Sequence, residues 1–305
     1  MASLGLHAVL LCGMASALDP RVEIAPNVLM PRLTLNAFPN TSSWLRVGGR
    51  AMDCALDYGD ERQGELGRAV AASGLPRSEV FITTKVPCCP KGPFGPSGWP
   101  FLPVAGCGNA TRNTTADIEH DLHVIGVGYV DLLLLHFTCD RFEDTLRTWR
   151  VLETAALSGR ARAIGVSNFN RTDLEQLVAA ARVRPAVNQA GFAIGSPQNQ
   201  TLGRDWGTVR RCQELGVTYM AYAPFGERNA TAPTSRVDVL RDPTVRRVAQ
   251  RHNRSTAQVG LRWVLQHGMA VVTSASSAAY QEEDLGVFEE GFELSEQDMA
   301  ELDAV

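Results

Sequence analysis

Short apolar segments of strand length alternate with helical segments along most of this chain. The strand candidates are rich in Val, Ile and Leu and lack strict alternation, which is typical of strands buried on both faces. They span residues 32–35, 50–53, 80–85, 130–136, 163–167, 186–189, 218–222 and 270–273. Helical segments follow most of them, at residues 61–72, 116–125, 142–158, 171–181, 205–215 and 256–267. The alternation predicts an α/β fold, a closed (β/α)8 TIM barrel in one domain over residues 18–305. A doubly wound open sheet shows the same alternation, but no GxGxxG follows the first strand.

Two connections depart from this rhythm. Residues 38–49 leave room for only a short first helix. The loop at 86–115 is long and rich in Pro and Gly, and it holds Cys88, Cys89 and Cys107. A loop of this length in a compact domain is usually functional or needs crosslinking, so we expect disulfides among these cysteines and Cys139.

Charge and hydropathy exclude two classes of partner. The net charge is 29 − 33 = −4 and no Lys/Arg run occurs, which argues against nucleic acid. No apolar run reaches the roughly 18 residues of a membrane span. The adjacent Cys88 and Cys89 are too close for a CxxC metal motif, and no metal site is expected.

The N-terminus indicates the secretory pathway. Residues 4–17 form a short apolar stretch that ends in Ala15-Ser16-Ala17, a small-x-small pattern typical of cleavage sites. We therefore predict that residues 1–17 are a signal peptide. A buried first strand or helix is the alternative, which would suit a cytosolic enzyme.

Asparagine and cysteine usage agree with this localisation. Of 11 asparagines, seven open an N-x-Ser/Thr triplet, whereas the 36 Ser and Thr residues predict roughly one by chance. We expect N-glycans on surface positions among these seven. Six cysteines follow the predicted signal peptide, an even number that suggests disulfides in an oxidising compartment. Cys54 and Cys212 lie in regular segments and could equally be buried free thiols. The seven sites are Asn40, Asn109, Asn113, Asn170, Asn199, Asn229 and Asn253.

Polar residues stand at the ends of consecutive predicted strands. Asp53 ends the second strand, with Tyr58 five residues later, Lys85 ends the third and His136 ends the fourth. A lone Lys or His at a strand end is usually structural. In a barrel these ends converge on the face that carries active sites, so four residues of complementary chemistry predict a catalytic centre.

Six segments follow one another around these strand ends. They are MDCALDYGDE (52–61), FITTK (81–85), GYVDLLLLH (128–136), GRARAIGVSNF (159–169), PAVNQ (185–189) and AYAPFG (221–226). In sequence, order and spacing these segments resemble those of the aldo-keto reductase family. The resemblance covers about residues 30–305, with weaker matches at 257–268 and 287–299.

The resemblance implies a catalytic set of Asp53, Tyr58, Lys85 and His136. Carbonyl reduction needs a hydride on carbon, which a nicotinamide supplies, and a proton on the developing alkoxide. Tyr58 is the expected general acid, with its pKa lowered by the nearby Lys85 ammonium. Asp53 would hold Lys85, and His136 would hydrogen-bond the carbonyl oxygen.

The resemblance also implies a coenzyme site. Ser167, Asn168 and Gln189 would hold the carboxamide and Tyr222 would stack on the nicotinamide. Ser274, Glu283 and Asp284 stand at the family's adenosine positions. NADP(H) is the family's coenzyme, but NAD(H) stays possible because the lysine and arginine that bind the 2′-phosphate are replaced.

Four departures from the family bear on specificity. The uncharged residues Ser274 and Tyr280 replace the family's two basic residues. We expect Asp284 to repel a phosphate while tolerating a ribose hydroxyl. Glu283 could still accept from the adenine amino group. The family's C-terminal tail over the substrate pocket is not expected here. The replacements are Thr273-Ser274-Ala275 for proline-lysine-serine, Tyr280 for arginine, and Phe137-Thr138 for tryptophan-proline.

The favoured hypothesis is an NAD(P)H-dependent aldo-keto reductase of the secretory pathway that acts on a small-molecule aldehyde or ketone. The alternative is a non-catalytic, glycosylated luminal or extracellular barrel that acts as a binding module. The missing phosphate-binding basic residues favour the alternative, and the complete set of four polar residues opposes it.

Overall fold

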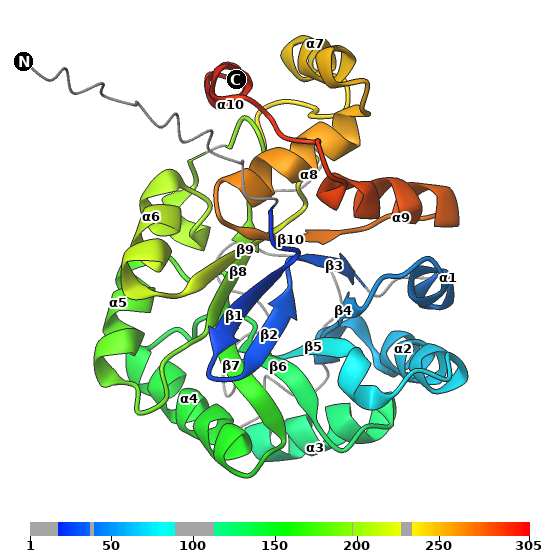
Figure 1. Cartoon of the computed structure of the whole chain (residues 1–305). Helices are drawn as coiled ribbons and strands as arrows, with labels where there is room; N and C mark the ends of the chain where they lie inside the picture. Colours follow the sequence, from blue (N-terminus) through cyan, green and yellow to red (C-terminus); the bar gives the residue numbers. More distant parts are fainter. Residues whose placement is uncertain (1–17, 37–39, 89–112, 197, 227–233) are drawn as a thin grey trace, which may run out of the picture.

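The computed structural model describes residues 18–36, 40–88, 113–196, 198–226 and 234–305. Its centre is a closed barrel of eight parallel strands, in which the last strand pairs with the first (Figure 1). The predicted TIM barrel is therefore confirmed. The strands are β3 (Leu33–Asn36), β4 (Ala51–Asp53), β5 (Phe81–Val86), β6 (Val130–Leu135), β7 (Ala161–Ser167), β8 (Val187–Gly191), β9 (Thr218–Tyr222) and β10 (Ala270–Thr273).

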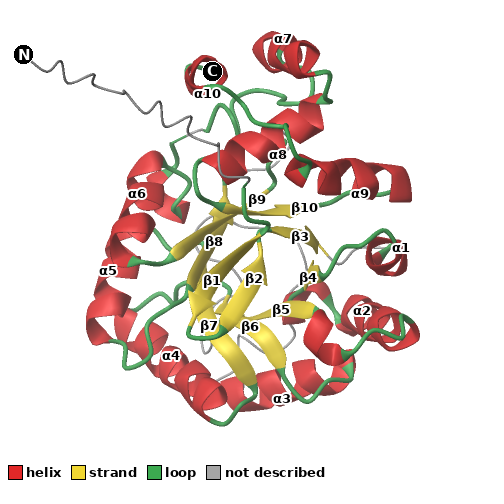
Figure 2. Ribbon diagram, viewed as in Figure 1, coloured by secondary structure: helices red, strands yellow, loops and turns green. Residues whose placement is uncertain are grey.

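Helices surround the barrel and separate its strands from solvent (Figure 2). Within the described part of the chain they include α1 (Thr41–Arg46), α2 (Asp60–Ala72), α3 (Thr114–Ile125), α4 (Phe142–Leu157), α5 (Arg171–Ala180), α6 (Trp206–Leu215), α7 (Pro243–His252), α8 (Thr256–Gln266), α9 (Ala278–Leu285) and α10 (Glu296–Asp303). Helix α1 has six residues, in agreement with the short first helix expected there. The ends of α3 and α6 coincide with Gly126 and Gly216, which adopt the left-handed conformation that glycine tolerates best.

An N-terminal hairpin was not predicted. Strands β1 (Arg21–Ala25) and β2 (Val28–Pro31) pair antiparallel, and Figure 1 shows them across one opening of the barrel. Ile24, Val28 and Met30 belong to the same apolar cluster as inward-facing residues of the barrel strands. The hairpin thus covers the end at which the strands begin, and it leaves the opposite end for a site.

The barrel interior changes from apolar to polar along the strands. Ala51 and Phe81 are packed in the interior cluster near the strand starts. Two residues further on come Asp53 and Thr83, which stand opposite each other in the β4–β5 register. Side chains two apart share a face of a strand, so each strand carries its interior pattern up to a polar layer at its carboxyl end.

One predicted crosslink and two predicted thiols lie in described residues. A disulfide joins Cys88, just after β5, to Cys139, just after β6, with Cα atoms 5.4 Å apart. Cys54 and Cys212 are buried free thiols. The predicted signal peptide, Cys89, Cys107, the sequons at Asn109 and Asn229, and most of the 86–115 loop lie outside the described residues. Among the helices that are described, none is long and apolar enough to span a membrane.

Candidate active site

The innermost part of the site is a buried ion pair between β4 and β5. Lys85 and Asp53 are both almost fully buried, and the Lys85 Nζ contacts Asp53 Oδ1. The same Nζ donates to the carbonyl oxygen of Cys54 at 3.0 Å. Burial disfavours the ammonium, but the pairing with Asp53 outweighs it and the pKa of Lys85 lies above its usual value. Lys85 is therefore a permanent positive charge at neutral pH.

Tyr58 lies beside this pair. The 3-10 turn Leu56–Tyr58 follows β4 and places the phenol ring 5.2 Å from Lys85 Nζ. The Lys85 ammonium acts in the expected direction and favours a lower pKa of Tyr58, but it does not decide the net shift. Burial raises the pKa of Tyr58 above its usual value, and the opposing effect of Lys85 is smaller. The phenol is therefore protonated at neutral pH, which is the form that a proton donor requires.

His136 follows β6 and faces the same turn. Its ring lies edge-on to Tyr58, with centroids 6.1 Å apart, and stacks on Phe137. Its Nδ1 is 3.0 Å from Oδ1 of Asp57, and both residues are buried. The structure thus brings all four predicted catalytic residues together and adds Asp57. Burial alone would raise the pKa of Asp57. The attraction and hydrogen bond of His136 lower it by more, so the pKa of Asp57 lies below its usual value.

The residues expected to hold a carboxamide form a connected network at the ends of β7, β8 and β9. Asn168 Nδ2 donates to Ser167 Oγ at 3.1 Å, and its Oδ1 accepts from the Tyr222 hydroxyl at 2.8 Å. Gln189 Nε2 donates to Oδ2 of Asp53 at 2.8 Å, which links the network to the ion pair. Arg204, fully buried, donates to the same Tyr222 hydroxyl.

This network fits the nicotinamide end of a coenzyme. Asn168 and Gln189 carry amide groups that can both donate and accept, as a carboxamide partner must. Tyr222 is half-buried at the mouth of the barrel, so its ring can offer a face to a planar group. Asn168 has a positive φ of 59°, a conformation that asparagine tolerates better than most residues.

Of the three residues expected at the adenosine end, Ser274 directly follows β10, and Glu283 and Asp284 lie on α9. Ser274 is exposed, and Glu283 accepts from the Ser255 hydroxyl. Asp284 is buried and accepts from Oγ1 of Thr273 at 2.7 Å.

The repulsion of a phosphate by Asp284 stays a prediction, and the burial of this carboxyl bears on its size. Burial raises the pKa of this carboxyl to about 7. It is therefore partly uncharged near neutral pH, and its repulsion is weaker than that of an exposed carboxylate.

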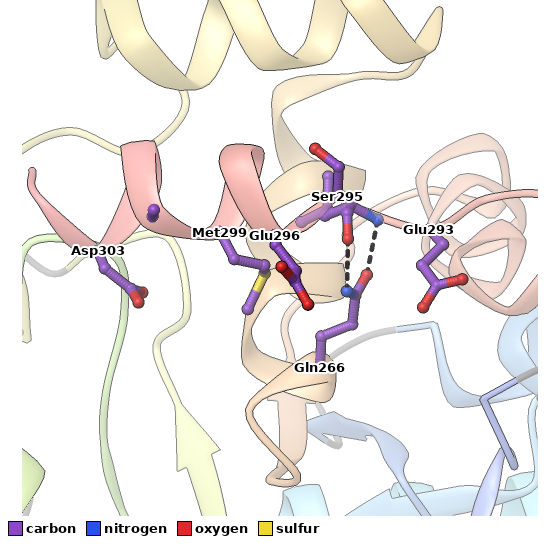
Figure 3. A pocket seen from close by; sticks show the side chains of 8 residues that line it. Gln266, Glu293, Ser295, Glu296, Met299 and Asp303 are labelled. Atoms are coloured by element: carbon purple, nitrogen blue, oxygen red, sulfur yellow. Dashed lines mark hydrogen bonds between the residues drawn. The ribbon is translucent and has the colours of Figure 1, made fainter. Parts of the chain in front are cut away.

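A surface hollow lies elsewhere, between α8 and α10 (Figure 3). In this hollow Gln266 exchanges two hydrogen bonds with the backbone of Leu294. Helix α8 ends there shortly before β10 begins, so the hollow lies at the barrel end where strands start. Active sites of this fold use the other end, where Asp53, Lys85 and His136 lie.

Comparison with known proteins gives one consistent result. A profile of the Aldo/keto reductase family matches residues 38–305. The chain is 30% identical to a morphine 6-dehydrogenase of Pseudomonas putida, over 93% of this chain and 90% of that protein. It is 30% identical to a glyoxal reductase of Bacillus subtilis, over 96% of this chain and 95% of that protein. A crystal structure of a Bombyx mori aldo-keto reductase in complex with NADP superposes with a TM-score of 0.73 at 24% identity, and covers 93% of this chain and 92% of its own.

Proposed function

The chain belongs to the aldo/keto reductase family and acts as an NAD(P)H-dependent oxidoreductase on carbonyl compounds, and from that premise we propose that Tyr58 is its proton donor. The observation that carries the proposal is the convergence of the Tyr58 ring, the Lys85 ammonium and the His136 ring at one barrel end. This is the constellation that a developing alkoxide needs. A non-catalytic barrel would have no use for a buried Lys85–Asp53 pair beside a protonated phenol.

Each residue of the site has a separate role in the reduction. When bound, the nicotinamide supplies the hydride. The carbonyl carbon receives that hydride, the electron pair of its π bond moves to oxygen, and oxygen takes the proton of Tyr58. Lys85 stabilises the phenolate that remains, and Asp53 keeps Lys85 charged and in place. His136 hydrogen-bonds the carbonyl oxygen and orients it.

The coenzyme residues keep their expected roles in this proposal. Ser167, Asn168 and Gln189 would hold the carboxamide, and Tyr222 would cover the nicotinamide ring. Gln189 is already bonded to Asp53, so coenzyme binding would rearrange or share that amide.

The assay that tests the function follows the loss of reduced coenzyme with a panel of carbonyl compounds. Glyoxal belongs in the panel because one relative is a glyoxal reductase. Simple aliphatic and aromatic aldehydes and a cyclic ketone complete it. Coenzyme binding, measured in parallel by nicotinamide fluorescence, separates two failures. Tight coenzyme binding without turnover on any carbonyl would favour the binding-module alternative, and turnover on at least one compound supports the reductase.

For the choice of coenzyme we infer weak discrimination between NADPH and NADH. Members of this family generally use NADP(H). In this chain Ser274 and Tyr280 replace the two cations, and both are exposed side chains with no positive charge. Arg171, a basic residue close to Asn168 in sequence, is paired with Glu175 at 3.1 Å. Charge-assisted contacts to a phosphate are strong, so losing both removes most of the usual preference.

Dissociation constants for the two coenzymes at one salt concentration test this inference. We expect values within about tenfold of each other, or about 1.4 kcal/mol. A preference for NADPH above about 100-fold, or about 2.7 kcal/mol, would show that the phosphate has another cationic partner.

We also propose that the protein is made in the secretory pathway, with residues 1–17 removed as a signal peptide and N-glycans attached. The Cys88–Cys139 disulfide supports an oxidising compartment. Asn113 and Asn253 are exposed, as glycan acceptors must be. Asn170 caps α5 two residues after Asn168, so we expect little glycan there. Loss of mass on treatment of the native protein with peptide-N-glycosidase supports this localisation, and an unchanged mass with an intact N-terminus contradicts it.

A further inference from the structure

Asp57 has no assigned role in the reaction described above, yet its carboxylate contacts the ring of His136. The Oδ1 of Asp57 and the Nδ1 of His136 are 3.0 Å apart. The side chains are 5% and 9% exposed, so water competes little for the contact. The two residues are 79 positions apart in sequence. They meet because the 3-10 turn Leu56–Tyr58 packs against β5, and β5 pairs with β6, which ends just before His136.

The chemistry of an imidazole restricts what this contact can be. An ionised carboxylate only accepts hydrogen bonds, so Nδ1 of His136 must carry the proton. The low pKa of Asp57 agrees with an ionised carboxylate. A neutral ring with its proton on Nδ1 has a bare lone pair on Nε2. That form cannot donate to a carbonyl oxygen, and only the imidazolium can.

Other contacts fix the backbone of His136 and cover one face of its ring. The backbone amide of His136 donates to Val86 O at 2.9 Å, and its carbonyl accepts from Asn168 Nδ2 at 3.2 Å. Phe137 stacks on one face of the ring, with centroids 4.7 Å apart. No hydrogen bond joins Nε2 of His136 to any residue in the described ranges. Nε2 is therefore the ring nitrogen left for a substrate oxygen.

We propose that Asp57 is a positioning residue that keeps a proton on Nδ1 of His136, so that His136 donates to the substrate oxygen from Nε2 as the imidazolium. The Asp57 carboxylate balances the charge of that imidazolium inside a buried site. Carbonyl reduction then uses His136 in its charged form, and the reverse oxidation of an alcohol uses the neutral ring as an acceptor. The inference rests on the proposed carbonyl reduction.

The ionisable groups around His136 come from three elements. Asp57 and Tyr58 lie on the 3-10 turn, Lys85 on β5 and Asp53 on β4. Lys85 opposes a second positive charge nearby, but it is already paired with Asp53. Tyr58 is uncharged at neutral pH because burial raises its pKa. Asp57 is thus the anion in direct contact with the ring.

The test compares Asp57→Asn with the parent by two independent measurements. The first is nuclear magnetic resonance of protein labelled with ¹⁵N at its histidines, in which ring nitrogen shifts report which nitrogen is protonated. Loss of a charge within about 4–6 Å should reduce the ratio of imidazolium to neutral His136 at fixed pH by about tenfold or more. The neutral ring should also lose its preference for a proton on Nδ1. This readout needs no turnover.

The second measurement is kcat/KM for carbonyl reduction as a function of pH. We expect a loss of about tenfold or more at neutral pH, because each lost proton on Nε2 removes a donor. The deficit in kcat/KM should narrow as the pH is lowered, because acid then protonates the ring without help from a carboxylate. A purely structural defect would be similar at every pH.

Two further variants make the result decisive. Asp60→Asn is the matched control, because Asp60 contacts the exposed His120 at 2.9 Å, and it should behave as the parent. Asp57→Glu keeps the charge and should recover much of the imidazolium. If Asp57→Asn fails to fold, the ring nitrogen shifts of His136 in the parent still decide the proposal, because an unprotonated Nδ1 there would overturn it.

The outcomes separate the two claims. An unchanged imidazolium ratio in Asp57→Asn, or a deficit that is constant with pH, overturns the role of Asp57. A parent protein that reduces no carbonyl compound overturns the proposed function, and the spectra then decide the role of Asp57 alone.

Discussion

Replacing Asp53 by asparagine should destabilise the whole fold through Lys85. The parent carboxylate accepts from two donors, Lys85 Nζ and Gln189 Nε2. An asparagine offers one accepting oxygen and one donating NH₂ group, so one of the two donors would face another donor. Lys85 would keep the Cys54 carbonyl at 3.0 Å as its other partner, in a fully buried position.

The size of the effect follows from the burial of the ammonium. Burial without a counter-charge lowers a lysine pKa by about 3–5 units, and each unit is about 1.36 kcal/mol, so the ceiling is about 4–7 kcal/mol. Removing one partner of a buried pair typically costs about 3–5 kcal/mol after relaxation. We therefore expect Asp53→Asn to lower the free energy of unfolding by about 3–5 kcal/mol at neutral pH.

The pH dependence of this loss has a definite sign. In the parent, the pKa of Lys85 is raised by folding, so its contribution is fully present at neutral pH. In Asp53→Asn, burial would place the folded pKa of Lys85 below the unfolded value of about 10.4. The unfolded state then binds more protons, and stability rises with pH between those two values.

Urea unfolding at about pH 7 and about pH 9.5 measures both quantities. The double variant Asp53→Asn/Lys85→Met should recover much of the loss, because apolar groups can replace a buried ion pair at little cost. Asp144→Asn, which breaks a pair with the largely exposed Arg147, should leave stability unchanged within error. A loss below about 1 kcal/mol at neutral pH, or one that does not shrink at high pH, would refute the reasoning.

Three further predictions concern the crosslink, the buried acid near β10 and the glycans. Joint replacement of Cys88 and Cys139 by serine should cost about 4 kcal/mol in urea unfolding, because the crosslink spans 51 residues, and a loss under about 1 kcal/mol contradicts this. Asp284→Asn should stabilise the protein more at about pH 8 than at about pH 5, because a carboxyl whose pKa is raised to about 7 by folding costs stability progressively as the pH rises from its unfolded pKa of about 3.9 to about 7, and equal gains would contradict this. Glycopeptide mass spectrometry should find Asn113 occupied, because its side chain is exposed and its amide nitrogen is not needed to cap α3. Asn40 should be mostly unmodified, because its amide nitrogen donates to Ser276 O, and the reverse occupancies contradict the placement.

The barrel was predictable because its strands are buried on both faces and its helices begin and end at recognisable residues. Strands β9 and β10 have the predicted bounds, and the others differ by one to three residues at their ends. The hairpin of β1 and β2 was missed because it is short and alternates, and because the preceding residues favoured a signal peptide. Helix α7 carried a signal that was overlooked, since Asp242 caps its first turn and Pro243 follows.

The residues that form the candidate site could be predicted from sequence, but the shifts of their pKa values could not. Strand ends converge in any barrel, so Asp53, Lys85 and His136 could be placed together from sequence. The direction in which the pKa of Tyr58 shifts could not be predicted from sequence. The degree of burial decides that direction, and no motif encodes burial. Asp57 was missed for a similar reason. Its contact with His136 depends on how the turn that follows β4 packs beside β5, although an acid directly before Tyr58 was visible in the sequence.

Carbonyl reduction by Tyr58→Phe, with coenzyme binding followed in the same preparation, tests the role of Tyr58 as proton donor most directly. We expect coenzyme affinity and thermal unfolding to match the parent, while turnover falls by about 10²–10⁴-fold, because the proton donor alone has been removed. Turnover within a factor of about two of the parent would show that the proton comes from another group, and would contradict the central claim.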